Sequence, residues 1–127
     1  MVCNMNEDKI HAQVCAYIRL RYPKALFNSD LSGIKLTMGQ SVKVKNLRSG
    51  RGFPDLVIYE RRGSYAACFI ELKADGVKLW KRNGDWANAH LREQADMISE
   101  LIDRGYFASF AVGFDEAKRL IDGYMAL

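Results

Sequence analysis

The chain has 127 residues, of which 49% are hydrophobic and 27% are charged. This length predicts one domain spanning residues 1–127, and the composition excludes an intrinsically disordered chain. Residues 1–84 carry 15 Lys and Arg against 7 Asp and Glu, whereas residues 85–127 carry 4 against 8. A basic region beside an acidic one is typical of a protein that lays one face on a polyanion, although on the charge alone a solvated basic loop is the favoured explanation.

The cysteines and the apolar runs indicate a cellular compartment. There are three cysteines, without CxxC spacing, so Cys15 and Cys68 are interpreted as small core residues and a zinc site is not expected. No apolar run approaches the roughly 18 residues of a membrane span, and the first residues lack the apolar centre of a signal peptide. We therefore expect a cytoplasmic protein in a reducing environment that has no membrane partner.

The first half of the chain predicts a helix, a short strand and a long basic segment. Apolar residues recur with helical spacing along residues 7–21, and Pro23 ends this helix. A short strand is expected at residues 25–28. Residues 29–54 are basic and rich in Gly and Ser, which predicts an irregular segment with a short helix near residues 39–47.

Two strands in the middle of the chain are predicted to form an antiparallel pair. Residues 55–59 (DLVIY) and 65–73 (YAACFIELK) are almost continuously apolar and are separated by a short turn. Unbroken apolar runs are typical of strands that are covered on both faces. The following residues 74–87 predict a polar loop with a hairpin turn at Asn83-Gly84.

The last third of the chain predicts a helix, a strand and a second helix. Residues 88–104 form the first helix, which Gly105 ends. Its core side is expected to carry Leu91, Ala95, Ile98, Leu101 and Ile102. A buried strand follows at residues 107–112, and Asp115 is expected to cap a helix over residues 116–126. The whole order predicts an α/β domain with helices packed on a mixed central sheet.

Three charged residues on the two middle strands are the strongest candidates for an active centre. Glu71 and Lys73 are two residues apart and project from one face of their strand, while Asp55 opens the antiparallel neighbour and can converge with them. Two close carboxylates repel each other unless a cation lies between them, and a hard cation such as Mg²⁺ prefers oxygen ligands. Such an ion neutralises charge on a scissile phosphate and activates water, which a lysine can position.

Each part of this pattern also has a purely structural explanation. An E-x-K triplet occurs by chance about once in a chain of this size. A G-x-P-D segment is a common junction between a loop and a strand, with backbone roles for Gly52 and Pro54. A buried salt bridge from Lys73 to Asp55 is the best structural explanation of the charges. The occurrence of both motifs at mutually reachable strand ends favours the active-site interpretation.

Two further polar residues lie on the apolar faces of predicted helices. Glu7 shares the face of the apolar residues that follow it, but it fits a capping box over residues 4–7 equally well. Gln94 lies on the core side of its helix, where a hydrogen-bonded buried amide is the commoner role. His11 and His90 are interpreted as surface or core-edge residues without a convincing ligand partner.

Over nearly its whole length the chain resembles the VRR-NUC domain, the virus-type replication-repair nuclease branch of the PD-(D/E)XK superfamily. The most specific match is GFPD at residues 52–55 with ELK at residues 71–73 and the downstream Gln94. The supporting matches are Glu7, Asn28, Ser32-Gly33, Gly105-Tyr106 and the helix from Asp115 to Tyr124. The resemblance implies a restriction-endonuclease-like core with the order α-β-β-β-α-β, in the small stand-alone form carried by phages and bacteria.

The resemblance also implies roles for the residues of the candidate centre. Asp55 and Glu71 would be ligands of Mg²⁺ or Mn²⁺, with the backbone carbonyl of Leu72 as a possible third ligand. Lys73 would be the catalytic lysine.

The resemblance extends to two helix residues near that centre. Glu7 matches a glutamate of the first helix that contributes to the metal site, and Gln94 matches a glutamine that supports it. His11 departs from the pattern, because many relatives have a glutamine four residues after the helix glutamate.

We therefore expect a metal-dependent DNA endonuclease that prefers branched DNA such as Holliday junctions. The alternatives are a less selective endonuclease or exonuclease, and a non-catalytic DNA-binding module on the same fold. The basic residues expected to contact DNA phosphates are Lys43, Lys45, Arg48 and Arg51.

A homodimer is the expected active particle, because the symmetric cleavage of a four-way junction needs two identical centres. The aromatic residues Trp80, Trp86 and Phe107 are candidates for its interface. For Phe107, a place in the core of the monomer is the better interpretation.

Overall fold

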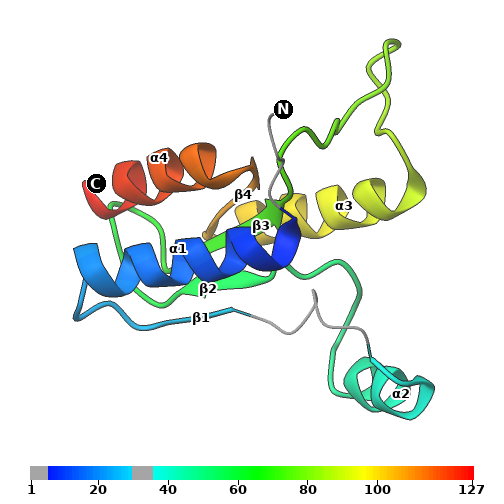
Figure 1. The fold of residues 1–127 in the computed structure, drawn as a ribbon, viewed down its shortest axis with the longest axis horizontal. Helices are drawn as coiled ribbons and strands as arrows, with labels where there is room; N and C mark the ends of the chain where they lie inside the picture. The colour runs from blue at the N-terminus through cyan, green and yellow to red at the C-terminus, as the bar shows by residue number, and fades with distance from the viewer. Residues whose placement is uncertain (1–5, 30–35) are drawn as a thin grey trace.

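The computed structural model describes residues 6–29 and 36–127, in which four strands and four helices form an α/β domain (Figure 1). The strands are β1 (Phe27–Ser29), β2 (Leu56–Ile58), β3 (Cys68–Lys73) and β4 (Phe107–Val112). The helices are α1 (Glu7–Arg21), α2 (Met38–Asn46), α3 (Ala89–Asp103) and α4 (Phe114–Met125). The Ser32-Gly33 match noted in the sequence lies outside the described residues.

The chain order α1-β1-α2-β2-β3-α3-β4-α4 contains the expected α-β-β-β-α-β core. Helix α2 is inserted between β1 and β2, and α4 follows the core. The four strands form one sheet in the order β1-β2-β3-β4. The pairs β1–β2 and β2–β3 are antiparallel, whereas β3–β4 is parallel and is connected through α3. The prediction of a mixed central sheet flanked by helices is confirmed.

Helices α1, α3 and α4 lie in two layers on either side of this sheet. Helices α1 and α4 lie side by side and pack against β3, and α3 packs against β4 from the opposite face (Figure 1). The larger core joins α1, α4 and the sheet through fully buried residues such as Ile10, Leu72 and Ile121. No helix in the described ranges has both the length and the apolar character needed to cross a bilayer.

Helix α1 has the bounds that its periodicity predicts. Ile10, Val14 and Ile18 form its buried stripe, each with 0% exposure. The side chain of Asn6 accepts a hydrogen bond from the Lys9 N–H at 2.9 Å, so Asn6 is the N-cap residue. Glu7 is therefore the first residue of the helix, which contradicts the alternative of a capping box over residues 4–7, whose first two residues lie outside the described range.

Strands β2 and β3 are shorter than the apolar runs suggest. Their antiparallel pairing is confirmed, with Leu56 opposite Ile70, but β3 begins at Cys68 rather than at Tyr65. The reason is that Tyr65 closes a small turn instead, exchanging backbone hydrogen bonds with Arg62.

Two expectations about the last helices are also wrong. Ile102, which was expected on the core side of α3, is 52% exposed. The buried face of α3 consists of Leu91, Gln94, Ile98 and Leu101 and does not include Ile102. Asp115 does not cap α4. The N-cap position is taken by Gly113, and Asp115 lies in the first turn, where its negative charge interacts favourably with the helix dipole.

Candidate functional site

The polar and charged residues buried in the described part of the chain form one connected group. They are Asp55, Glu71, Lys73 and Gln94, with exposures of 1%, 3%, 8% and 5%. Burying charged side chains costs free energy, and an apolar core does not require it. The predicted residues therefore form a buried polar cluster inside the domain, at the C-terminal half of β3.

The backbone around β2 and β3 brings Asp55 to Glu71. Leu56 pairs with Ile70, so the antiparallel register continues to Asp55 beside Glu71. Gly52 positions the segment that precedes Asp55, because it has a φ of +79° and a Cβ there would lie 2.7 Å from the backbone oxygen of Glu93. The GFPD segment is thus held directly against α3, as the backbone role predicted for this glycine requires.

Both carboxylate oxygens of Asp55 have partners. Its Oδ1 accepts a hydrogen bond from the backbone N–H of Leu72 at 3.0 Å. Its Oδ2 lies 3.0 Å from Nε2 of His11. The Leu72 N–H fixes the orientation of the carboxylate, and this leaves Oδ2 directed toward α1.

Glu71 has one satisfied oxygen and one orphaned oxygen. Its Oε1 accepts a hydrogen bond from Nε2 of Gln94 at 2.7 Å, whereas Oε2 is buried without a hydrogen-bond partner. Burial and the negative charge of Asp55 raise the pKa of Glu71 to about 8, although Lys73 acts in the opposite direction. A buried carboxylate oxygen without a donor is the kind of group that a divalent cation would satisfy, so the donor set fits a metal ion.

Lys73 forms an ion pair within the cluster, but its partner is not Asp55, which the structural explanation of the sequence pattern had expected. Its Nζ lies 3.5 Å from Oε1 of Glu71, so the ion pair joins Lys73 to Glu71 and not to Asp55. Side chains two residues apart on a strand share a face, and this local geometry brings the two groups together. The ammonium group is held at the site with a side-chain exposure of 10%.

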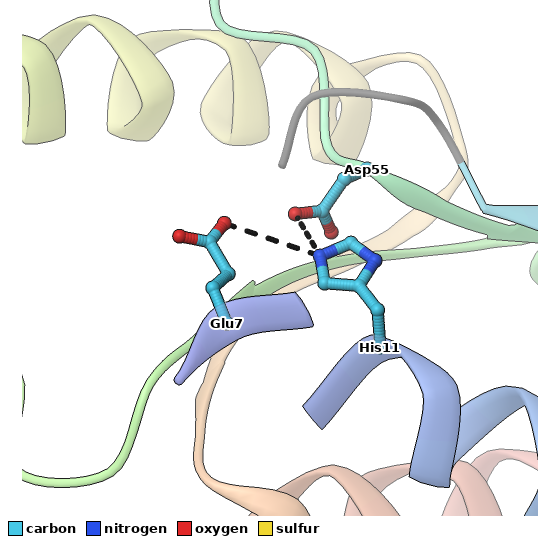
Figure 2. Close-up of side chains that lie close together, drawn as sticks. All are labelled: Glu7, His11 and Asp55. Carbon is cyan, nitrogen blue, oxygen red and sulfur yellow. Dashed lines mark hydrogen bonds and ion pairs between the residues drawn. The ribbon is translucent and has the colours of Figure 1, made fainter. Parts of the chain in front are cut away.

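Helix α1 adds a second group of potential ligands. Figure 2 shows Glu7 and His11 of α1 converging on Asp55. The Nε2 atom of His11 lies 3.9 Å from Oε1 of Glu7, and one potential ligand atom from each of the three residues lies within 4.8 Å of the others. The prediction that His11 has no ligand partner is wrong. The signal that could have revealed it is the spacing of four from Glu7, which places both residues on one helix face.

The imidazole of His11 is held from both sides. Its Nδ1 lies 2.7 Å from the Oγ of Ser29 on β1, opposite the contact of Nε2 with Asp55. Burial lowers the pKa of His11, but the hydrogen bond and negative charge of Asp55 outweigh it, so the pKa is raised above its usual 6.5. His90, by contrast, is exposed on α3, as expected.

The expected DNA contacts lie on and after α2. Lys43 and Lys45 are exposed on this helix, which projects away from the sheet (Figure 1). Arg48 lines a cavity of about 320 Å³ together with Asp55. Arg51 is also exposed and lies 3.8 Å from the carboxylate of Glu93. The structure thus brings Arg48 to the candidate centre and leaves the two lysines farther out on the surface.

The candidate interface aromatics separate into surface and core residues. The hairpin turn predicted at Asn83-Gly84 forms, and it pairs Trp80 with Trp86 at a ring distance of 5.3 Å. Trp86 also packs on Phe110, while Trp80 stays 55% exposed. Phe107 packs against the core, as its alternative interpretation proposed.

Comparison with known proteins identifies this fold. A solved structure described as a VRR_NUC domain protein aligns with 98% of this chain and 91% of its own chain, with a TM-score of 0.71 and 24% sequence identity. No protein-family model and no curated protein matches the sequence. The chain therefore shares the fold of that VRR_NUC domain protein, and the resemblance seen in the sequence is confirmed at the level of the fold.

Proposed function

We propose that this protein is a metal-dependent DNA nuclease with Asp55, Glu71 and Lys73 at its active centre. The observation that carries the proposal is the buried charge cluster, in which Glu71 keeps an orphaned oxygen beside a second carboxylate. Such a cluster is unfavourable unless a cation or a substrate completes it. The shared fold with a protein described as a VRR_NUC domain protein supports a nuclease-type domain.

The residues that would hold a divalent cation are Asp55, Glu71 and Glu7. An ion such as Mg²⁺ or Mn²⁺ supplies charge neutralisation at the scissile phosphate and acidifies the attacking water. Gln94 orients Glu71 through its 2.7 Å hydrogen bond. In the same way the backbone N–H of Leu72 orients Asp55 at 3.0 Å.

Lys73 contributes a positive charge next to these carboxylates. Its ion pair with Glu71 holds the ammonium group at the centre. A lysine in this place can position the attacking water or donate a hydrogen bond to a phosphate oxygen. Neither role needs Lys73 to leave the site, because the side chain is already buried among the acidic groups.

The basic residues provide a path for the DNA backbone toward this centre. Arg48 shares a cavity with Asp55, and Lys43 and Lys45 continue the positive charge along α2. Phosphate contacts fix the position of a duplex without reading its sequence. We extend the proposal to branched DNA such as a Holliday junction and to a homodimer, since two symmetric cuts need two centres.

A cleavage assay tests the proposal. Four-way junction, flap, linear duplex and single-stranded DNA are incubated with the protein in Mg²⁺, Mn²⁺ or EDTA. We expect cleavage in the metal ions, none in EDTA, and loss of cleavage in Asp55→Asn and Lys73→Ala. Both variants should retain their fold and most of their DNA affinity, because most phosphate contacts are expected from the basic residues outside the centre.

The matched control is His90→Gln, which changes an exposed residue of α3 and should cleave like the wild type. Unchanged turnover in Asp55→Asn would contradict the active centre. Metal-independent DNA binding without cleavage of any substrate would instead identify a non-catalytic binding module.

A further inference from the structure

We propose that Nε2 of His11 is a nitrogen ligand of the metal centre, and that this ligand makes the centre prefer a transition-metal dication, represented by Mn²⁺, over Mg²⁺. The inference rests on the proposed function and specifies the ion that the centre takes. His11 stands where the resemblance leads one to expect a glutamine, so the property would be specific to chains with this residue.

The distances fit a shared ion. Metal ions of this class bind nitrogen and oxygen at about 2.0–2.2 Å, so two ligands of one ion lie no more than about 4.4 Å apart. The Nε2 atom of His11 lies 3.0 Å from Oδ2 of Asp55 and 3.9 Å from Oε1 of Glu7. Both separations fall within this limit, and the three side chains already converge on one point (Figure 2).

A second observation points to a ligand at this place. Glu71, only 3% exposed, has a buried Oε2 without any hydrogen-bond partner. Asp55 belongs to the group formed with Glu7 and His11, and the antiparallel register places it opposite Glu71, so the two carboxylates are neighbours. A cation bound by Asp55 and His11 would therefore offset the negative charge around both carboxylates.

The contact with Ser29 prepares the imidazole for this role. A histidine that binds a metal through one ring nitrogen usually donates a hydrogen bond from the other. Nδ1 of His11 lies 2.7 Å from Oγ of Ser29, which can accept that hydrogen bond. With the proton on Nδ1, the lone pair of Nε2 faces Asp55 and Glu7 and is available to a metal.

The chemistry of the ligands determines which ion the centre binds more tightly. Mg²⁺ is bound through oxygen ligands and retains much of its water, whereas a transition-metal dication accepts an imidazole nitrogen more readily. A purely carboxylate centre discriminates little between Mg²⁺ and Mn²⁺. Adding one imidazole nitrogen raises the affinity for Mn²⁺ relative to that for Mg²⁺.

Metal binding tests this inference without reference to cleavage. Mn²⁺ and Mg²⁺ are titrated by calorimetry, and the bound Mn²⁺ is examined by pulsed electron paramagnetic resonance for coupling to a ¹⁴N nucleus. We expect ¹⁴N coupling in the wild type and in His90→Gln, and its loss in His11→Gln. The affinity of His11→Gln for Mn²⁺ should fall at least about tenfold, while its affinity for Mg²⁺ stays unchanged.

Mn²⁺ that binds to the wild type without ¹⁴N coupling would overturn the role of His11, and this result does not depend on whether a variant folds. If that binding is still lost in Asp55→Asn, the proposed active centre survives. If Asp55→Asn binds Mn²⁺ as the wild type does, the proposed active centre fails as well. Circular dichroism of each variant shows whether a loss of binding reflects unfolding.

Discussion

At the scale of single residues, Glu71 is held in surroundings that oppose its charge. It is buried next to Asp55, and one of its oxygens has no donor. Burial and Asp55 raise its pKa to about 8 from an ordinary 4.5. Lys73 and Gln94 offset part of this cost through their contacts with Oε1. The stability of the metal-free protein should therefore depend on whether the Glu71 carboxyl group is protonated.

We expect the metal-free wild type to lose stability as the pH rises from about 4.5 to about 8, the window set by Glu71. Between these two pH values the folded state binds the proton of Glu71 more tightly than the unfolded state does. The stabilisation from the protonated Glu71 carboxyl group is therefore complete below pH 4.5 and is lost as the pH passes through about 8. Glu71→Gln should remove this part of the pH dependence. Its Tm in EDTA above pH 8 should exceed that of the wild type by a few degrees.

Thermal unfolding in EDTA across this pH range measures the difference between the two proteins. Glu100→Gln is the matched control, because Glu100 lies exposed on α3 with a side-chain exposure of 61%. A Glu71→Gln curve parallel to that of the wild type would show that Glu71 is not destabilised by its charge.

At the scale of elements, the loop before β2 and the helix α2 prepare the site in different ways. The loop is held against α3 at Gly52, where a side chain would meet the backbone of Glu93. Helix α2 projects from the sheet, capped by Thr37 in a reciprocal capping box with Gln40. The loop therefore determines where Asp55 lies, and α2 determines where positive charge is displayed.

Gly52→Ala should lower the free energy of unfolding by about 1–3 kcal/mol, because it combines a φ of +79° with a Cβ placed 2.7 Å from the oxygen of Glu93. The displacement should also reach Asp55 and reduce metal binding. Gly39→Ala on α2 is the control, since nothing lies within 4 Å of its Cβ position and alanine favours a helix. Urea denaturation of both variants measures their free energies of unfolding. Equal stabilities would show that the loop can move away from α3.

The basic segment should bind DNA through charge alone. Replacing Lys43, Lys45, Arg48 and Arg51 together by glutamine should weaken binding to all sequences and flatten its salt dependence, by up to about four phosphate contacts. Fluorescence anisotropy over a range of salt concentrations measures the slope. A control variant neutralises four exposed cations elsewhere, namely Lys24, Arg104, Lys118 and Arg119. If the first variant keeps the wild-type slope, the segment is only solvated surface.

At the scale of the whole molecule, residues 6–29 and 36–127 carry one candidate centre, so the symmetric cleavage of a junction requires a second copy. The hairpin residue Trp80 is a candidate contact, because it is 55% exposed and its partner Trp86 provides the packing on Phe110. Large exposed aromatic residues are enriched at the cores of protein interfaces. Trp80 can thus be replaced without opening the core of the monomer.

We expect light scattering at micromolar concentration to give twice the 14.4 kDa of one chain, and Trp80→Ser to shift the protein toward the monomer. Leu20→Ser is the matched control, since Leu20 is 84% exposed on α1 and should leave the mass unchanged. A mass near that of one chain, both free and on junction DNA, would rule out the dimer and favour a nicking or end-directed activity.

The sequence by itself determined those features that depend on local geometry. The helical spacing of Ile10, Val14 and Ile18 predicted α1 with its observed bounds, and the largely apolar segment FASFAV predicted β4. The alternation of side chains along β3 predicted that Glu71 and Lys73 would lie together, and the short turn before it predicted an antiparallel partner. In each case the relevant residues are neighbours along one helix or one strand pair, so their spacing determines the outcome.

Only the tertiary structure decided which side chains meet across elements. His11 and Asp55 are 44 residues apart, and their contact depends on how α1 packs over the sheet. The bond from Gln94 to Glu71 depends in the same way on the placement of α3. Periodicity shows which face of a helix is buried, but not which atoms of the opposite layer it meets, because that is determined by the packing of all the side chains between them.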